Sequence, residues 1–170
     1  MAIPPEIVPP DSHYLWAATG WLDLGVPAEA EAELDKVSKD FQSHPDVLEV
    51  RWLILAQTKR WETALTVARA LLEGAPERSS GWVHQAYSLR RVSSDGLQQA
   101  WDSLLPAYEK FPGEPTIAYN LSCYACAMRE TEQARAWFRR ALKIGDRERI
   151  KEKALVDPDL EPLWDEIQKL

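Results

Sequence analysis

The chain has 170 residues, of which 45% are hydrophobic and 28% are charged, and its net charge is −7. This length fits one domain or one repeat array with a sizeable buried core. No apolar run approaches the roughly 18 residues of a membrane span, and two cysteines are too few for a disulfide-stapled secreted fold. The acidic balance argues against non-specific nucleic-acid binding. We therefore expect a cytoplasmic protein that binds neither nucleic acid nor a membrane.

Charge is unevenly spread along the chain. Residues 1–50 carry a net charge of −8, whereas residues 129–153 carry +4 and the last 17 residues carry −4. Such runs are typical of solvated helix faces. The alternative is an electrostatic docking face, through which copies of the chain could associate weakly, head to tail, as a homo-oligomer.

The first predicted element is an extended arm over residues 1–11, because four of these residues are prolines. After the arm, small and apolar residues recur with a period near 34. The clearest set consists of four alanines, Ala30, Ala64, Ala100 and Ala134. Two extra residues fall in the turn-rich segment 92–96, where a loop absorbs them at little cost. Apolar residues at i, i+3, i+4 and i+7 predict two amphipathic helices in each unit.

The periodic pattern divides into four helix pairs. The expected pairs span residues 12–44, 45–78, 79–114 and 115–146. Asp11 and Ser12 are expected to cap the first helix, Gly25 to end it, and Pro27 to open the second. No alternating strand pattern occurs in the sequence, so we expect an all-α fold.

Small and large residues alternate along the third and fourth pairs in a recognisable pattern. The third pair has Trp82, Ala86, Leu89, Ala100, Leu104, Ala107 and Pro112, and the fourth has Leu121, Ser122, Ala125, Ala134, Phe138 and Ala141. This pattern resembles the tetratricopeptide (TPR) family, as found in small bacterial TPR proteins. Arg51 and Gln85 depart from it, since the family has leucine there, and Trp52 replaces a usually small residue. The resemblance implies a right-handed α-solenoid of about four TPR helix-turn-helix repeats.

Residues 147–170 are expected to form capping helices. A helix is predicted over 147–156, with a stop at Asp157-Pro158 and a last short helix from Pro162. An apolar stripe is expected to cover the last repeat, formed by Leu160, Leu163, Trp164 and Ile167. This segment resembles the end element of many bacterial TPR proteins, and a solenoid needs such an element to cover its terminal apolar face.

The sequence offers few candidates for chemistry. Cys123 and Cys126 form a C-x-x-C motif, which places both sulfurs on one helix face. A redox or metal role is an alternative, but the motif has no second copy and no nearby histidine, which favours packing or groove residues. Asp157 and Asp159 are interpreted as helix caps. Because nucleotide-binding, hydrolase and zinc-protease motifs are missing from the sequence, we expect no metal, no cofactor and no enzymatic activity.

In TPR proteins the first helices of the repeats line a concave groove, and the resemblance implies that this chain binds a peptide or protein segment there. The expected lining mixes aromatic bodies with polar groups. Its residues are Leu15, Trp16, Thr19, Glu49, Leu53, Val83, His84, Tyr87, Arg90, Tyr119, Asn120 and Cys123. The Lys, Asn and Arg clamp that some members use for a C-terminal carboxylate is not reproduced, because Leu15, Thr19 and Glu49 occupy positions that need basic or amide groups.

Three alternatives to a peptide-binding groove stay open at this point. The groove residues could face water or a segment of the same chain, such as the proline-rich arm. The chain could instead be a chaperone-like binder of an unstable client, or a self-assembling scaffold that uses its acidic and basic segments.

Overall fold

A computed structural model describes residues 4–170, so residues 1–3 of the expected arm lie outside the described part of the chain. Across residues 4–170 the chain is helical and contains no strand, which confirms the all-α expectation. Among the helices of this range, none has both the length and the apolar character that a membrane span requires. Two compact units make up the chain, Met1–Ser88 and Leu89–Leu170.

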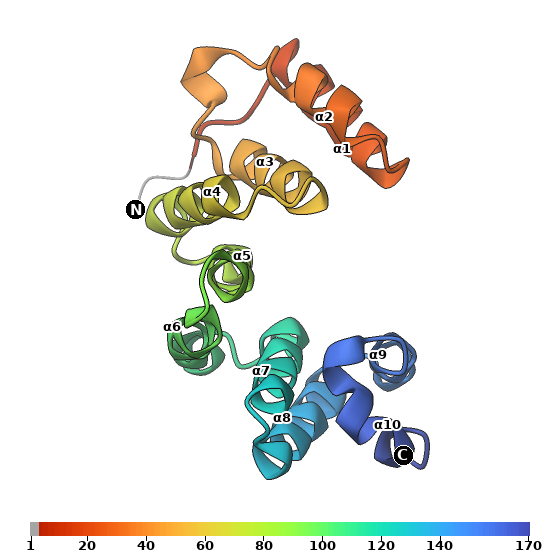
Figure 1. The fold of residues 1–170 in the computed structure, drawn as a ribbon. Helices are drawn as coiled ribbons and strands as arrows, with labels where there is room; N and C mark the ends of the chain where they lie inside the picture. The colour runs from red at the N-terminus through yellow and green to blue at the C-terminus, as the bar shows by residue number, and fades with distance from the viewer. Residues whose placement is uncertain (1–3) are drawn as a thin grey trace. The chain divides into compact units, whose positions relative to one another are not determined.

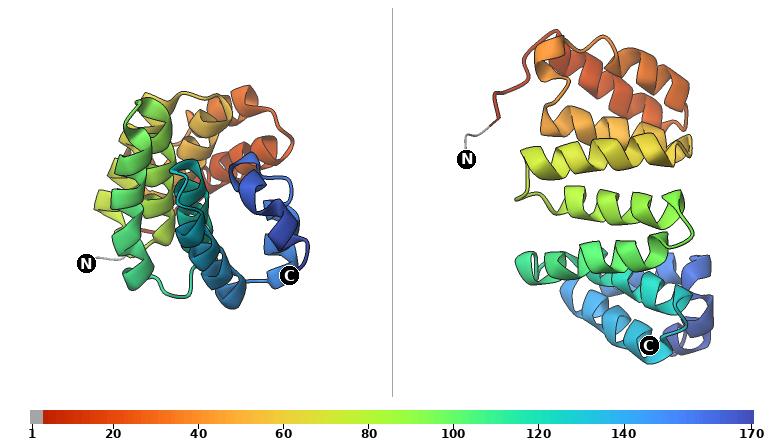
Figure 2. Two further views of the ribbon diagram at one scale, coloured as in Figure 1. Left: turned by 60° about the horizontal axis from the view of Figure 1, so that its bottom comes forward. Right: turned by 60° about the vertical axis from the view of Figure 1, so that its left-hand side comes forward.

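The first unit contains two helix pairs and most of a fifth helix. Its elements are α1 (Asp11–Asp23), α2 (Pro27–Leu34), the 3-10 helix η1 (Lys39–Phe41), α3 (Pro45–Gln57), α4 (Trp61–Gly74) and α5 (Ser79–Val92), whose last turn belongs to the second unit. Helix α1 packs against α2 and α3, and α3 packs against α4 (Figures 1 and 2).

Turn residues set the ends of the first two helices, with one difference from the sequence expectation. Gly25 follows α1 with a φ of +72°, a conformation that glycine adopts without steric cost, and Pro27 is the first residue of α2. Asp11, however, does not cap α1, because the capping position is Pro10. Its carboxylate accepts hydrogen bonds from the backbone N–H of Ser38, at 2.6 Å, and from the Ser38 hydroxyl, at 3.0 Å. Asp11 therefore holds the loop after α2 against the start of α1.

The periodic alanines are all buried, and each lies in the first half of its helix. Ala30 in α2 and Ala64 in α4 are fully buried, and so are Ala100 and Ala134 in the second unit. A methyl side chain lets two helices approach closely, and protein cores are packed too densely to admit a larger group without rearrangement. The repeat in the sequence therefore corresponds to repeated close helix contacts.

The second unit is built around α7. Its elements after the end of α5 are α6 (Gly96–Lys110), α7 (Pro115–Ala127), α8 (Thr131–Ile144), α9 (Arg147–Ala154), the 3-10 helix η2 (Pro158–Leu163) and α10 (Trp164–Ile167). Helix α7 packs against α6, α8 and η2, and nine of its thirteen residues are buried. In Figures 1 and 2 the C-terminal segment folds back beside α7 and α8.

The C-terminal segment differs slightly from its expected helix bounds. Helix α9 ends at Ala154, and Pro158 opens a helical turn instead of only stopping one, while α10 begins at Trp164 and not at Pro162. Of the apolar stripe, Leu160, Leu163 and Ile167 are at most 2% exposed, and Trp164 is half-buried. The Trp164 indole N–H donates to the carbonyl oxygen of Ala154 at 2.8 Å, which ties α10 to the end of α9.

Candidate functional site

The start of α7 positions the side chains of the candidate site. The Glu114 carboxylate accepts a hydrogen bond from the backbone N–H of Thr116 at 3.0 Å, and Pro115 is the first helical residue. Both features favour a helix that begins here. Tyr119 and Cys123 follow on one side of the helix, because residues four apart lie one above the other.

Three residues expected in the groove are brought together, and the chain's own C-terminal segment faces them. The two terminal guanidinium nitrogens of Arg90, Nη1 and Nη2, donate to the two carboxylate oxygens of Asp159. The Tyr119 hydroxyl donates to an Asp157 carboxylate oxygen at 2.8 Å, and the Cys123 sulfur lies 3.8 Å from that same oxygen. We call Arg90, Asp159, Tyr119 and Asp157 the acidic latch.

Burial and charge govern the protonation of the latch. The hydrogen bonds to Asp159 raise the pKa of Arg90, so its guanidinium stays charged. Burial, followed by the hydrogen bond to Asp157, raises the pKa of Tyr119 far above its usual value, so the phenol is a permanent donor. A bidentate arginine–carboxylate pair is among the stronger polar contacts in proteins and fixes orientation as well as distance.

The same place brings together one group of potential metal ligands. One ligand atom each from Cys123, Asp157 and Asp159 lies within 4.8 Å of the others. Each carboxylate is already held by a donor of the latch, and burial raises the pKa of the Cys123 thiol well above neutral pH. Burial also raises the pKa of Cys126, to about 11. Because metal binding and redox chemistry need a thiolate, this arrangement favours an internal ionic contact over a metal or redox centre.

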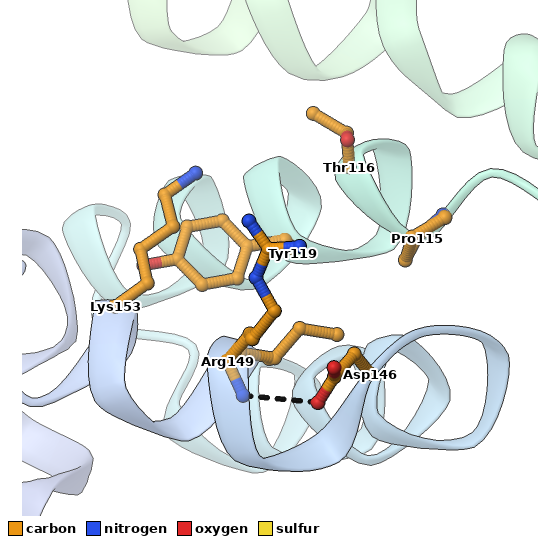
Figure 3. A pocket seen from close by; sticks show the side chains of 7 residues that line it. Pro115, Thr116, Tyr119, Asp146, Arg149 and Lys153 are labelled. Carbon is orange, nitrogen blue, oxygen red and sulfur yellow. Dashed lines mark hydrogen bonds between the residues drawn. The ribbon is translucent and has the colours of Figure 1, made fainter.

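A pocket of about 480 Å³ opens beside the latch, between α7 and α9. Figure 3 shows Arg149 and Lys153 extending from α9 toward α7, next to the Tyr119 ring. The Lys153 ammonium lies 4.3 Å from the centre of that ring. Asp146 caps α9 by accepting from the backbone N–H of Arg149 at 3.2 Å. Pro115, Thr116 and Ile150 complete the lining. We call this cavity the α7–α9 pocket.

The pocket carries more positive charge than its own acids balance. Both Arg149 and Lys153 are exposed, and within residues 4–170 neither forms an ion pair. Asp146 is the only acid that lines this pocket among the described residues. Asn120, also expected in the groove, lies next in sequence to Tyr119 and donates to the Thr116 carbonyl oxygen at 3.0 Å. The α7–α9 pocket can therefore bind an anionic group beside the apolar side chains of Pro115 and Ile150.

In the first unit, the residues expected on α1 lie beside the proline-rich arm. Leu15 and Trp16 line a cavity of about 330 Å³ together with residues 4–7 of the arm. Thr19 donates its hydroxyl to the Leu15 carbonyl oxygen at 3.0 Å and points to solvent. The arm thus covers part of the surface on which the sequence predicted a ligand.

Of the two groove residues expected on α3, Glu49 makes polar contacts within the chain and Leu53 is exposed to solvent. The Glu49 carboxylate accepts from the Ser80 hydroxyl and lies 3.6 Å from the Arg78 guanidinium. Leu53 is 42% exposed. Glu49 therefore already has partners at the start of α5, whereas Leu53 is free for contact with another molecule.

The residues expected on α5 lie mostly against α3. The His84 ring stacks on Trp52 with ring centres 3.7 Å apart, and Tyr87 meets both Trp52 and Trp61 edge-on or tilted, with ring centres 5.8 Å apart. Val83 is half-buried. His84 and Tyr87 thus serve packing within the first unit. The reason is Trp52, whose indole reaches across from α3 and covers them.

Asp157 and Asp159 of the latch, and every residue that lines the pocket except Tyr119, were not recognised as site residues in the sequence. Asp157 does cap η2, accepting from the Asp159 backbone N–H at 3.1 Å, but its other oxygen and the Asp159 side chain bind groups far along the chain. Arg149 and Lys153 are four residues apart on α9, and that spacing could have indicated a shared helix face.

Solved structures with a similar fold include TTC0263, a thermophilic TPR protein in Thermus thermophilus. It has a TM-score of 0.73 and 16% identity, over 94% of this chain and 100% of that one. MamA 41-end from Desulfovibrio magneticus RS-1 has a TM-score of 0.66 and 18% identity, over 79% of this chain and 75% of that one. A MamA RS-1 double mutant has a TM-score of 0.66 and 16% identity, over 87% and 79%.

These likenesses show the fold. The chain has an all-α helical-repeat fold of the TPR type, as the sequence pattern predicted. The sequence matches no protein-family model and no curated protein. At identities of 16–18% the similarity concerns architecture, and a fold of this kind does not specify what is bound.

Proposed function

We propose that this chain is a non-catalytic protein-interaction module whose α7–α9 pocket binds an acidic segment of a partner protein. The observation that carries the proposal is the pair of exposed cations, Arg149 and Lys153, which face α7 across the pocket without an acidic partner in residues 4–170. Helical-repeat folds present extended surfaces that suit such binding. A helical-repeat fold does not specify a ligand, so the chemistry proposed for the ligand comes from the residues of the pocket.

The acidic latch supports the same chemistry at the neighbouring position. There the chain's own Asp157 and Asp159 are bound by Tyr119 and Arg90. The neighbouring pocket, which Tyr119 also lines, adds a pair of cations, Arg149 and Lys153. An aspartate or glutamate of the partner would meet Arg149 and Lys153, and an adjoining apolar side chain would lie against Pro115 and Ile150.

A charge-reversal capture experiment tests the proposal. The pair Arg149→Glu and Lys153→Glu reverses the pocket charge, and the control pair Arg69→Glu and Lys143→Glu makes the same net change at exposed positions on α4 and α8. We expect wild type and control to capture the same partner from a lysate of the native host, and the pocket variant to retain about a tenth of it or less. Circular dichroism establishes that all three proteins are folded.

Equal capture by all three proteins would refute the α7–α9 pocket as the binding site. A partner whose contacting segment lacks acidic residues would refute the proposed chemistry even if capture depended on the pocket. Limited proteolysis of the captured complex, followed by mass spectrometry, identifies that segment.

A further inference from the structure

Four of the six exposed large apolar side chains described in the first unit lie on α1 and the turn after it. Trp16 is 69% exposed, Leu24 73%, Val26 37% and Trp21 36%. Trp16 keeps this exposure with the described arm residues in place. Apolar clusters of this kind on a folded surface mark contacts with other molecules.

These residues form a stripe along α1. Trp16, Gly20 and Leu24 are four residues apart and lie in one row, and Ala17 and Trp21 form the neighbouring row. A Cβ atom placed on Gly20 meets nothing within 4 Å. The stripe therefore has a shallow notch at Ala17 and Gly20 between the large side chains at its two ends. This relief matches the side-chain ridge of another helix, since helices pack ridge into groove.

The border of the stripe is acidic. Residues 4–35 contain no lysine or arginine. Asp23 lies two turns after Trp16 on nearly the same side of α1, and Glu29 is exposed in the first turn of α2. Neither carboxylate forms an ion pair within residues 4–170, whereas Glu31 is paired with Arg60. The surface around the stripe therefore keeps unpaired negative charge.

The end of α1 adds to this negative field. Asp23 is in the last turn of α1, which has no basic residue. The carboxyl end of a helix carries partial negative charge, so an acid there is unfavourable and a base is favourable. A cation supplied by another molecule would meet both Asp23 and the partial negative charge at this end of α1.

We propose that this face of α1 is a second docking surface, which binds a basic amphipathic helix of a partner protein. The apolar stripe takes the apolar side of that helix, and Asp23, Glu29 and the end of α1 take its lysines or arginines. Charge argues against two other occupants. A second copy bound through the same face would bring the same acids together, and an anionic lipid surface would repel them.

Two model peptides test the proposed chemistry directly. One is an amphipathic leucine–lysine peptide of roughly four helical turns, and the other has glutamate in place of each lysine. Titration into labelled full-length protein is followed through the indole N–H signals in NMR spectra. We expect the lysine peptide to shift the Trp16 and Trp21 signals and to bind at least about tenfold more tightly than the glutamate peptide.

Matched variants separate the stripe from its charge. Trp16→Ala removes the largest exposed side chain, and Leu53→Ser on α3 is its control. Asp23→Lys with Glu29→Lys reverses the border, and Asp40→Lys with Asp165→Lys makes the same net change elsewhere. The proposal requires about a tenfold or greater loss of lysine-peptide affinity in the first variant of each pair and none in its control.

Three results would overturn this inference. The first is equal affinity for the two peptides, and the second is a set of NMR shifts centred on tryptophans other than Trp16 and Trp21. The third is a shift of the Trp16 signal with protein concentration alone, which would assign the face to a second copy. The Arg149→Glu and Lys153→Glu variant should bind the lysine peptide normally, so failure here and failure of the α7–α9 pocket are distinguishable.

Discussion

Trp52 and His84 stack face to face, with ring centres 3.7 Å apart and ring planes 7° from parallel. The contact joins α3 to α5 within the first unit and buries much of the histidine side chain. The Nδ1 atom of His84 is buried and has no hydrogen-bond partner within residues 4–170. The imidazole is therefore held as a neutral aromatic ring.

This environment predicts a loss of stability in mild acid. Burial lowers the pKa of His84 from 6.5 to about 4. Because the unfolded chain binds the proton more tightly than the folded one, the stabilisation is complete above pH 6.5 and is lost progressively as the pH falls toward 4. The full effect is roughly 3 kcal/mol at most.

The measurement is urea unfolding at several pH values, on wild type and on His84→Phe, which keeps a stacking ring but cannot titrate. Carboxylates titrate in both proteins, so the difference between the two curves isolates His84. The free energy of unfolding should fall more steeply for wild type between pH 6.5 and 4. Parallel curves would show that His84 does not titrate as described.

A buried hydrogen bond beside this stack should also be measurable. The Trp52 indole N–H donates to the Ser88 hydroxyl at 3.0 Å, and Ser88 is fully buried. Ser88→Ala leaves the indole N–H without an acceptor, which costs about 1–3 kcal/mol of unfolding free energy. Chemical denaturation measures the loss, and Ser43→Ala at an exposed position is the control. A change below about 0.5 kcal/mol would mean that water or another group replaces the hydroxyl.

The acidic latch predicts strong coupling between two residues 69 positions apart. Arg90 and Asp159 form a bidentate pair and are both partly buried. In a double-mutant cycle of Arg90→Gln and Asp159→Asn, we expect the second substitution to lower the free energy of unfolding much less when the first is already present. The expected coupling is about 1–3 kcal/mol. Additive losses would show that the pair contributes nothing beyond its separate contacts.

A glycine at the start of α6 predicts a backbone constraint in the second unit. A Cβ on Gly96 would lie 2.0 Å from the carbonyl oxygen of Leu89, so Gly96→Ala forces α6 away from the end of α5. We expect a loss of about 2–3 kcal/mol. Gly113→Ala is the control, because a Cβ there meets nothing within 4 Å. Equal stability of the two variants would contradict the close approach.

The repeat architecture could be predicted because its cause is local and periodic. A methyl side chain recurs every 34 to 36 residues, and Ala30, Ala64, Ala100 and Ala134 are all fully buried. The insertion predicted in segment 92–96 coincides with the turn before α6. Patterns within one or two helices were therefore sufficient to predict the fold.

The surroundings of the candidate site could not be predicted in the same way. Helical spacing predicts that Tyr119 and Cys123 lie on one side of α7. No local pattern indicates that Asp157, 34 to 38 residues later in the chain, contacts both side chains. Trp52 was visible as an unusual residue in its repeat. That its indole covers His84 follows only from packing across two helices, and binding at the groove residues stays a prediction.

We propose above that the α7–α9 pocket holds an acidic segment of a partner protein. Site-specific photo-crosslinking tests it most directly, with a benzophenone amino acid at Thr116, which lines the pocket, or at Thr66, an exposed control on α4. We expect a crosslink from position 116 alone, to a segment rich in aspartate or glutamate, and we expect it to disappear with Arg149→Glu and Lys153→Glu. A captured partner that crosslinks from position 66 but not from 116, or through a segment without acidic residues, would contradict it.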